Sequence, residues 1–267
     1  MDQGISANRS QEVVVENEKS DHVRVTSGVP QGAVLGPILF FIYINDLPEG
    51  TKSKIRLFAD DTAAYLTVNN LTDTGVLQQD LNKLQQWEVE WDMEFNPGKC
   101  TVLQVTRSRA PFPSQYTLHG QVLETVPSAK YLGVDFSKNL SWNNHIQRIC
   151  NSANRSLGFV KRNIRTKDPG VRELAYKALV RPLVEYASPV WSPYTKTYID
   201  KIEMVQRRAA RWTTNNFSCQ ASVIDMLNTL GWRSLKNRRS DARLCLFYKI
   251  IHGLVAVPLP PYVQHPV

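Results

Sequence analysis

The chain has 267 residues, of which 42% are hydrophobic, so it can form one large domain or two modest ones with hydrophobic cores. Its longest apolar run, residues 38–44, is far shorter than the ~20 residues that cross a bilayer, and its polar N-terminus predicts no signal peptide. The four cysteines have neither zinc-site spacing nor a Cys-x-x-Cys pair, so we expect reduced thiols in an intracellular protein (cytoplasm and nucleus) with no membrane partner.

The net charge of +8 is unevenly distributed along the chain. Residues 1–134 contain 11 Lys/Arg and 16 Asp/Glu, a net charge of −5, whereas residues 135–267 contain 21 and 8, a net charge of +13. An acidic half followed by a strongly basic half favours a nucleic acid or another anionic surface as the partner.

The first expected elements are two short strands, at residues 11–16 and 22–26, joined by a turn at residues 18–21. Residues 27–37 contain three glycines and two prolines, which predicts an irregular loop. The following helix, residues 38–47, is apolar on nearly every side, so we expect it to be buried. The glycine spacing matches neither a Walker A motif nor a Rossmann fingerprint, which argues against an ATPase or a dehydrogenase.

Residues 54–68 predict a β-hairpin with two adjacent carboxylates at its tip. Ile55 and Leu57 alternate with charged residues, which is the period of a strand, and residues 63–68 are apolar enough to form its partner. Two carboxylates about 4 Å apart repel by roughly 1 kcal/mol in water and roughly 4 kcal/mol at an effective dielectric constant of 20. In a cleft, Asp60 and Asp61 would therefore call for a cation, and their oxygens suit Mg²⁺. The alternative is a simple polar turn, since Asp is a favoured turn residue.

The remaining pattern changes from mixed elements to helices. Before residue 136 it predicts an amphipathic helix at 77–91 ending at 96–98, a strand at 99–105, a hairpin at 116–126 that turns at His119-Gly120, and a strand at 130–135. Beyond it, we expect helices at 142–163, 168–179, 198–212, 222–230 and 232–252, with a break at Pro182. The fold class is therefore α+β.

Several short segments occur together in a defined order, and this ordered set is much more specific than any one of the segments alone. They are Ser27-Gly28-Val29-Pro30-Gln31-Gly32 with Leu35-Gly36-Pro37, then Phe58-Ala59-Asp60-Asp61, Phe95-Asn96 with Lys99-Cys100, Tyr131-Leu132-Gly133-Val134, Tyr186 with Val190-Trp191, and the basic run 205–211. Over nearly its whole length the chain resembles the reverse transcriptase of a LINE-type, non-LTR retrotransposon. The resemblance implies RNA-templated DNA synthesis, a partial polymerase palm at residues 1–135, a basic helical thumb and C-terminal extension at 136–256, and a proline-rich tail at 257–267.

The resemblance also implies a role for each matched residue. Asp60 and Asp61 would be catalytic Mg²⁺ ligands, and Lys99 would protonate the leaving pyrophosphate, unless it is simply a solvated lysine at the start of a strand. The incoming dNTP would contact Pro30, Gln31 and Gly32. The DNA primer would contact Tyr131, Leu132 and Gly133, for which a plain edge strand is the alternative. Finally, the backbone of the RNA template and DNA primer would contact Arg207, Arg208 and Arg211, which in the simpler interpretation form a solvated helix face.

One departure from the family pattern concerns a further aspartate, which the family carries on a strand upstream of the loop at residues 27–37. Within residues 1–26, neither Asp2 nor Asp21 lies on an apolar strand of the right kind. We therefore expect this chain alone to polymerise weakly or not at all. The alternative functions are a non-catalytic nucleic-acid-binding remnant of a retrotransposon, in which the basic half acts alone, and a relic without activity.

Overall fold

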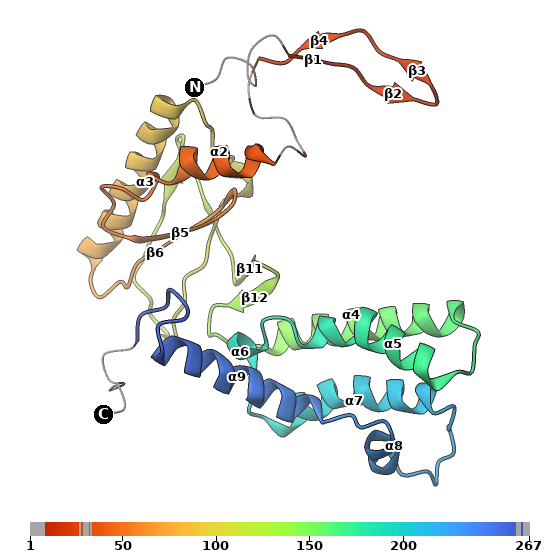
Figure 1. The fold of residues 1–267 in the computed structure, drawn as a ribbon. Coiled ribbons are helices and arrows are strands. Elements are labelled where there is room, and N and C mark those ends of the chain that lie inside the picture. Colours follow the sequence, from red (N-terminus) through yellow and green to blue (C-terminus); the bar gives the residue numbers. More distant parts are fainter. Residues whose placement is uncertain (1–8, 27, 29–31, 33, 260–262, 264–267) are drawn as a thin grey trace. The chain divides into compact units, whose positions relative to one another are not determined.

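A computed structural model describes residues 9–26, 28, 32, 34–259 and 263. The chain divides into two compact units, one formed by residues 1–102 and 109–124 and the other by residues 103–108 and 125–267 (Figure 1). In its described residues, unit 1 combines hairpins with the helices α2 and α3, and unit 2 is mainly helical, so the predicted α+β class is confirmed. Among the described residues, no helix combines the length and the apolar character that crossing a membrane demands.

The N-terminal strands of unit 1 form one antiparallel hairpin, in which β1 (Ser10–Gln11) pairs with β4 (Val23–Arg24) and β2 (Val14–Val15) pairs with β3 (Glu18–Lys19). Its turn consists of Glu16 and Asn17, whose φ angles are 52° and 70°. Two successive residues with positive φ match the right-handed twist of the strands they join. The expected turn at residues 18–21 was therefore wrong, because Glu18 and Lys19 belong to a strand.

Helix α2 (Leu35–Ile44) is packed on one side only. Ile44 and Phe40 belong to a core with Leu47, Ile55 and Leu84. In contrast, Ile38, Phe41 and Ile42 are 51%, 56% and 71% exposed. The prediction of a buried helix was wrong for this face, because no neighbouring element covers it within the described part of the chain.

The other elements of unit 1 surround this core and a second, smaller one. Strands β5 (Lys54–Phe58) and β6 (Asp61–Tyr65) form the predicted hairpin, although β6 starts two residues earlier than expected. Helix α3 (Leu71–Trp91) ends at Asp92, whose φ of 51° is left-handed, and not at residues 96–98, where a separate 3₁₀ turn, η1 (Pro97–Lys99), forms. The short strands that follow are β7 (Thr101–Val102), β8 (Thr117–Leu118), β9 (Gln121–Val122) and β10 (Glu124–Thr125). The β8–β9 turn lies at His119-Gly120, as predicted.

The strands β11 (Ser128–Tyr131) and β12 (Val134–Ser137) of unit 2 form a hairpin where a single strand was expected. They are joined by Leu132 and Gly133, whose φ angles of 45° and 80° reverse the chain. The helical elements after it are α4 (Asn143–Asn163), α5 (Pro169–Leu179), η2 (Arg181–Val184), α6 (Ser188–Trp191), α7 (Lys196–Thr213), α8 (Val223–Thr229) and α9 (Leu235–Ile251). The five longer helices match the predicted ones within three residues, whereas α6 was not predicted.

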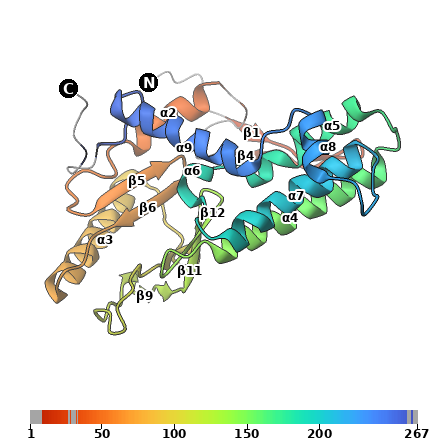
Figure 2. The same cartoon turned by 90° about the horizontal axis from the view of Figure 1, so that it is seen from below.

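Helices α4 and α7 lie side by side and run in the same direction (Figures 1 and 2). Lys201 donates a hydrogen bond to Gln147, and seven residues further along both helices Arg208 donates one to Asn154 Oδ1 at 2.9 Å. Because the bonded positions move toward the C-terminus by the same number of residues in both helices, the two helices are parallel. Their buried faces form the main core of unit 2, with Ile146, Ala153 and Val160 from α4 and Ile202, Val205 and Ala209 from α7.

Candidate functional site

The β5–β6 hairpin presents Asp60 and Asp61 at its tip, as the sequence predicted. Asp60 lies in the two-residue turn after Ala59, which has a φ of 50°, and Asp61 is the first residue of β6, opposite Phe58. Opposite residues of an antiparallel pair project to the same side of the sheet. Asp61 therefore shares the outer face of the hairpin with Phe58, which is 62% exposed, and both carboxylates are exposed as well.

The two carboxylates have open coordination sites. Within the described residues, neither accepts a hydrogen bond nor forms an ion pair, and no cluster of three or more His, Cys, Asp or Glu side chains is arranged to hold a metal. Mg²⁺ takes oxygen ligands in octahedral geometry and commonly binds one or two carboxylates together with water and substrate phosphates. Asp60 and Asp61 therefore fit as part of a Mg²⁺ site.

A buried carboxylate of α3 fixes the start of this hairpin. One oxygen of Asp80, Oδ2, accepts hydrogen bonds from Lys52 N at 3.0 Å, Ser53 N at 2.7 Å and Ser53 Oγ at 2.7 Å, immediately before β5. Asp80 is only 1% exposed. Burial raises its pKa, but these hydrogen bonds outweigh burial and hold the pKa below its usual value of 3.8, so Asp80 is ionised at neutral pH.

Of the other site residues predicted in unit 1, the structure describes Lys99 and Gly32. Lys99 is the exposed last residue of η1, and no hydrogen bond or ion pair joins it to Asp60 or Asp61 among the described residues. Gly32 has a φ of 80° and open space where a side chain would begin, so its backbone is accessible to a ligand. Pro30 and Gln31 lie outside the described residues.

The predicted primer contact is the turn of the β11–β12 hairpin, and two long-range hydrogen bonds hold it. Tyr186 donates to Leu132 O at 2.9 Å, and its ring lies 3.2 Å from the position that a Cβ on Gly133 would occupy. Arg148 of α4 donates to Gly133 O at 2.7 Å and to Asp135 Oδ2 at 2.6 Å. The sequence pattern gave no signal for either contact, because both partners lie far along the chain.

The three arginines predicted on α7 lie on its accessible side. Arg207 and Arg208 are exposed and Arg211 is partly exposed, with Arg208 bonded to Asn154 and Arg211 to Ser218 O. Neither contact involves a carboxylate, so the charges remain available to an anionic partner.

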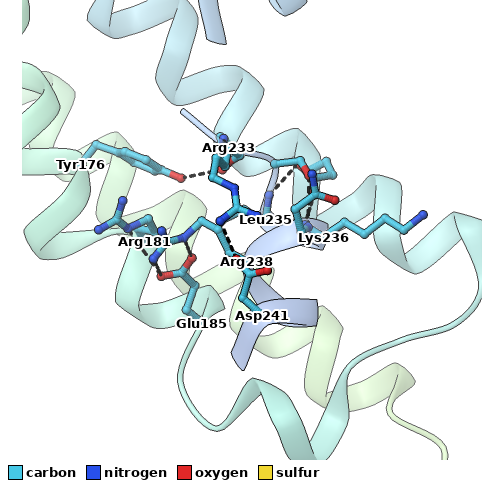
Figure 3. Close-up of polar contacts among 12 residues, drawn as sticks. Tyr176, Arg181, Glu185, Arg233, Leu235, Lys236, Arg238 and Asp241 are labelled. Carbon is cyan, nitrogen blue, oxygen red and sulfur yellow. Dashed lines mark hydrogen bonds and ion pairs between the residues drawn. The ribbon is translucent and has the colours of Figure 1, made fainter. Parts of the chain in front are cut away.

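The basic residues near the start of α9 are used differently. Figure 3 shows Arg238 and Arg181 both facing Glu185. The distance from Arg238 Nη2 to Glu185 Oε2 is 3.0 Å, and the distance from Arg181 Nε to the same oxygen is 3.5 Å. Arg233 forms a 2.6 Å ion pair with Asp241. The next residue after Arg238, Arg239, is 1% exposed. These arginines stabilise the fold of unit 2 and contribute much less than α7 to a surface for anions.

Residues 4–136 match the family model of the reverse transcriptase (RNA-dependent DNA polymerase). The matched region contains the hairpin with its two exposed aspartates, so the class of protein is that of the reverse transcriptases. The chain is also similar to curated proteins of mobile elements beyond this region. It is 31% identical over 202 residues to the RNA-directed DNA polymerase from mobile element jockey of Drosophila funebris (70% of this chain, 22% of the relative).

Two proteins of Drosophila melanogaster give the same result. The RNA-directed DNA polymerase from mobile element jockey is 27% identical over 215 residues, and the probable RNA-directed DNA polymerase from transposon BS is 28% identical over 219 residues, each match covering 76% of this chain. The chain belongs to the reverse transcriptases of non-LTR retrotransposons. It spans only 22–24% of the length of these three relatives.

Proposed function

We propose that this chain carries part of the nucleotidyl-transfer centre of an RNA-directed DNA polymerase, with Asp60 and Asp61 as ligands of catalytic Mg²⁺. The observation that carries the proposal is the exposed acidic pair at the tip of a tight hairpin inside the region that matches the reverse transcriptase family. RNA template, DNA primer and dNTP are the substrates that this family implies.

Each group has a distinct part in the proposed mechanism. Bound Mg²⁺ would supply charge neutralisation at the attacking 3′ oxygen and at the leaving pyrophosphate. Asp60 and Asp61 hold the metal. Pro30, Gln31 and Gly32 position the nucleotide, and the Lys99 ammonium donates a proton to the pyrophosphate oxygen that leaves.

The remaining residues position the nucleic acid. The turn at Tyr131, Leu132 and Gly133 holds the primer end, and Tyr186 and Arg148 keep that turn in place through the hydrogen bonds described above. Arg207, Arg208 and Arg211 bind phosphates of the template–primer backbone. In this proposal, residues 1–135 are part of a palm, 136–256 a basic thumb and C-terminal extension, and 257–267 a tail.

Metal binding and synthesis are tested separately, because two carboxylates are only part of the ligand set. In Mn²⁺ titrations followed by electron paramagnetic resonance, we expect weak binding by the chain and its loss in the Asp60→Asn, Asp61→Asn double variant. Glu90→Gln, which neutralises one exposed carboxylate of α3 in the same unit, is the control and should bind like the parent chain. Equal binding by all three proteins would exclude the hairpin as the metal site.

Primer extension on an RNA template with Mg²⁺ tests the reaction itself. We expect little synthesis by this chain alone, and any synthesis should disappear in Asp60→Asn. Extension that persists in Asp60→Asn would refute the role of this residue in catalysis.

The charge distribution supports a second candidate function, a non-catalytic nucleic-acid-binding module. Residues 135–267 have a net charge of +13, and the α7 arginines project from this part of the chain. This function predicts binding whose log affinity falls steeply with log salt and that Asp60→Asn leaves unchanged. Binding without salt dependence would exclude it.

A further inference from the structure

A cavity of about 890 Å³ opens in unit 2. It is lined by residues 106–108, by the segment 137–143 that leads into α4, and by residues 193–195, which precede α7. Backbone hydrogen bonds from Thr106 N to Lys138 O and from Lys138 N to Pro127 O form its wall. Arg107 and Lys138 line it, and none of the described residues that line it is acidic. The cavity is therefore basic, and none of the proposed catalytic residues contributes to it.

The first turns of α4 and α7 reach this cavity from the same side. Asn143 begins α4 and Tyr198 lies in the first turn of α7, and both line the cavity. Because the two helices are parallel, their dipoles point the same way, and each places a charge of about +0.5 at its N-terminus. Two such ends side by side repel one another, and an anion bound between or beside them would offset this repulsion.

Neither helix end neutralises this charge with its own side chains. Both first turns lack acidic residues, and neither N-cap residue, Trp142 or Thr195, bonds to the turn with its side chain. The Oγ1 atom of Thr195, a residue that lines the cavity, is buried and has no hydrogen-bond partner within the part of the chain that the structure describes. The backbone N–H groups of Lys196 and Thr197, two exposed residues of the first turn of α7, also have no hydrogen-bond partner among the described residues. These donors are arranged for an acceptor that the described chain does not supply.

An aromatic ring stands beside the basic cavity. Tyr194 lines it and is 92% exposed, immediately before the N-cap of α7. An exposed ring next to cationic and N–H donors is the combination that binds single-stranded nucleic acid, because a base stacks on the ring while the donors hold the adjoining phosphate. A paired base in a duplex offers no free face for this stacking.

We propose that this cavity binds an unpaired segment of nucleic acid, with one phosphodiester at the N-termini of α4 and α7 and its neighbouring base on Tyr194. The site goes beyond the proposed catalytic function and rests on it only for the class of ligand. Arg107 and Lys138 neutralise the backbone, and Tyr194 selects a strand with an unpaired base.

Fluorescence anisotropy of the full chain with a labelled oligo(dT) of about twelve nucleotides tests the site at low salt. We expect the Arg107→Gln, Lys138→Gln double variant to lose about tenfold in affinity. The control is Arg165→Gln with Lys167→Gln, which makes the same charge change at two exposed residues beyond the C-terminal end of α4 and should lose less than about threefold. Equal losses in the two double variants would reduce the site to general charge attraction and overturn it.

Two single variants separate the helix ends from the ring. Asn144→Asp places a carboxylate in the first turn of α4, so it should raise the melting temperature while lowering oligonucleotide affinity, which excludes unfolding as the cause. Unchanged affinity would remove the helix ends from the site. Tyr194→Ala should lose about fivefold or more for oligo(dT) and leave competition by inorganic phosphate unchanged. Unchanged oligo(dT) affinity in this variant would refute the stacking.

Competitors identify the source of the phosphate. Oligo(dT) should bind more tightly than dTTP or a blunt duplex of the same length, and equal binding of either competitor would overturn the assignment to an unpaired strand. Asp60→Asn, which tests the catalytic proposal, should leave oligo(dT) affinity unchanged. Failure of the catalytic proposal therefore appears in primer extension, and failure of the strand site appears in anisotropy.

Discussion

Removing the Asp80 carboxylate should loosen the acidic hairpin without touching either hairpin aspartate. Asp80→Ala leaves two backbone N–H groups and the Ser53 hydroxyl without their acceptor, and the site is buried. Hydrogen bonds to a charged group are worth about 1.5–3 kcal/mol each. The loss at Lys52 is smaller, because this residue is exposed and its N–H group can bond to water in the variant. We therefore expect a loss of about 3–5 kcal/mol in the stability of unit 1. Asp80→Asn, which keeps one acceptor oxygen, should lose about 1–2 kcal/mol.

Hydrogen exchange of peptides covering residues 52–66 measures this loss locally. Glu90→Gln removes a carboxylate from the exposed side of the same helix and should change protection by less than about 0.5 kcal/mol. The pKa of Asp80 in the folded chain lies below its usual value of 3.8. Its contribution to the stability is therefore fully present well above pH 3.8 and is lost as the pH falls through the folded pKa. The difference between the parent chain and Asp80→Asn should consequently shrink in acid. A difference as large at pH 2 as at pH 7, or an Asp80→Ala effect no larger than that of Glu90→Gln, would refute the anchoring role.

Two substitutions and one labelling experiment test individual positions. Gly133→Ala should cost about 1–2 kcal/mol in thermal unfolding, because Gly133 has a φ of 80° and a methyl group there meets a tyrosine ring, and a neutral result would contradict the observed turn. Ala59→Gly should stabilise the hairpin by up to about 1 kcal/mol, since Ala59 has a φ of 50°, and destabilisation would indicate another turn conformation. Burial raises the pKa of the Cys150 thiol, so an aromatic disulfide reagent should modify the exposed Cys219 and Cys245 first and Cys150 only on unfolding; early loss of Cys150 would disprove its burial.

The elements that sequence reasoning located well are those whose signal is local. Asp168 caps α5 immediately before Pro169, and the α4 stripe of Ile146, Ala153 and Val160 repeats at helical spacing and is buried. The acidic pair was placed at a hairpin tip because alternation along Ile55 and Leu57 fixes one strand. Each of these features needs only a few neighbouring residues, so tertiary packing did not change them.

The features that sequence reasoning missed depend on distant partners. An apolar helix surface is buried only where another element covers it, so the composition of α2 could not distinguish Phe40, which is packed, from Ile42, which is exposed. The β11–β12 turn needs Leu132 in a left-handed conformation, which is unfavourable locally and is supported by Tyr186 from elsewhere in the chain. Similarly, no pattern indicates that Asp80 accepts hydrogen bonds from the start of β5.

The same distinction changes what the positive charge of the second half implies for binding. The 21 basic residues of this half suggest a long contact with phosphates, but some of them are not available for it, because Arg238 is paired with Glu185 and Arg239 is 1% exposed. Arg172, only 6% exposed, donates to Trp212 O inside the helical unit. Each phosphate neutralised changes the slope of log affinity against log salt by about −0.9 for duplex and −0.7 for single strands. The measured slope should therefore reflect the accessible arginines and lysines, including those of α7 and of the cavity, because a buried or paired guanidinium contributes little to the release of counterions from the nucleic acid.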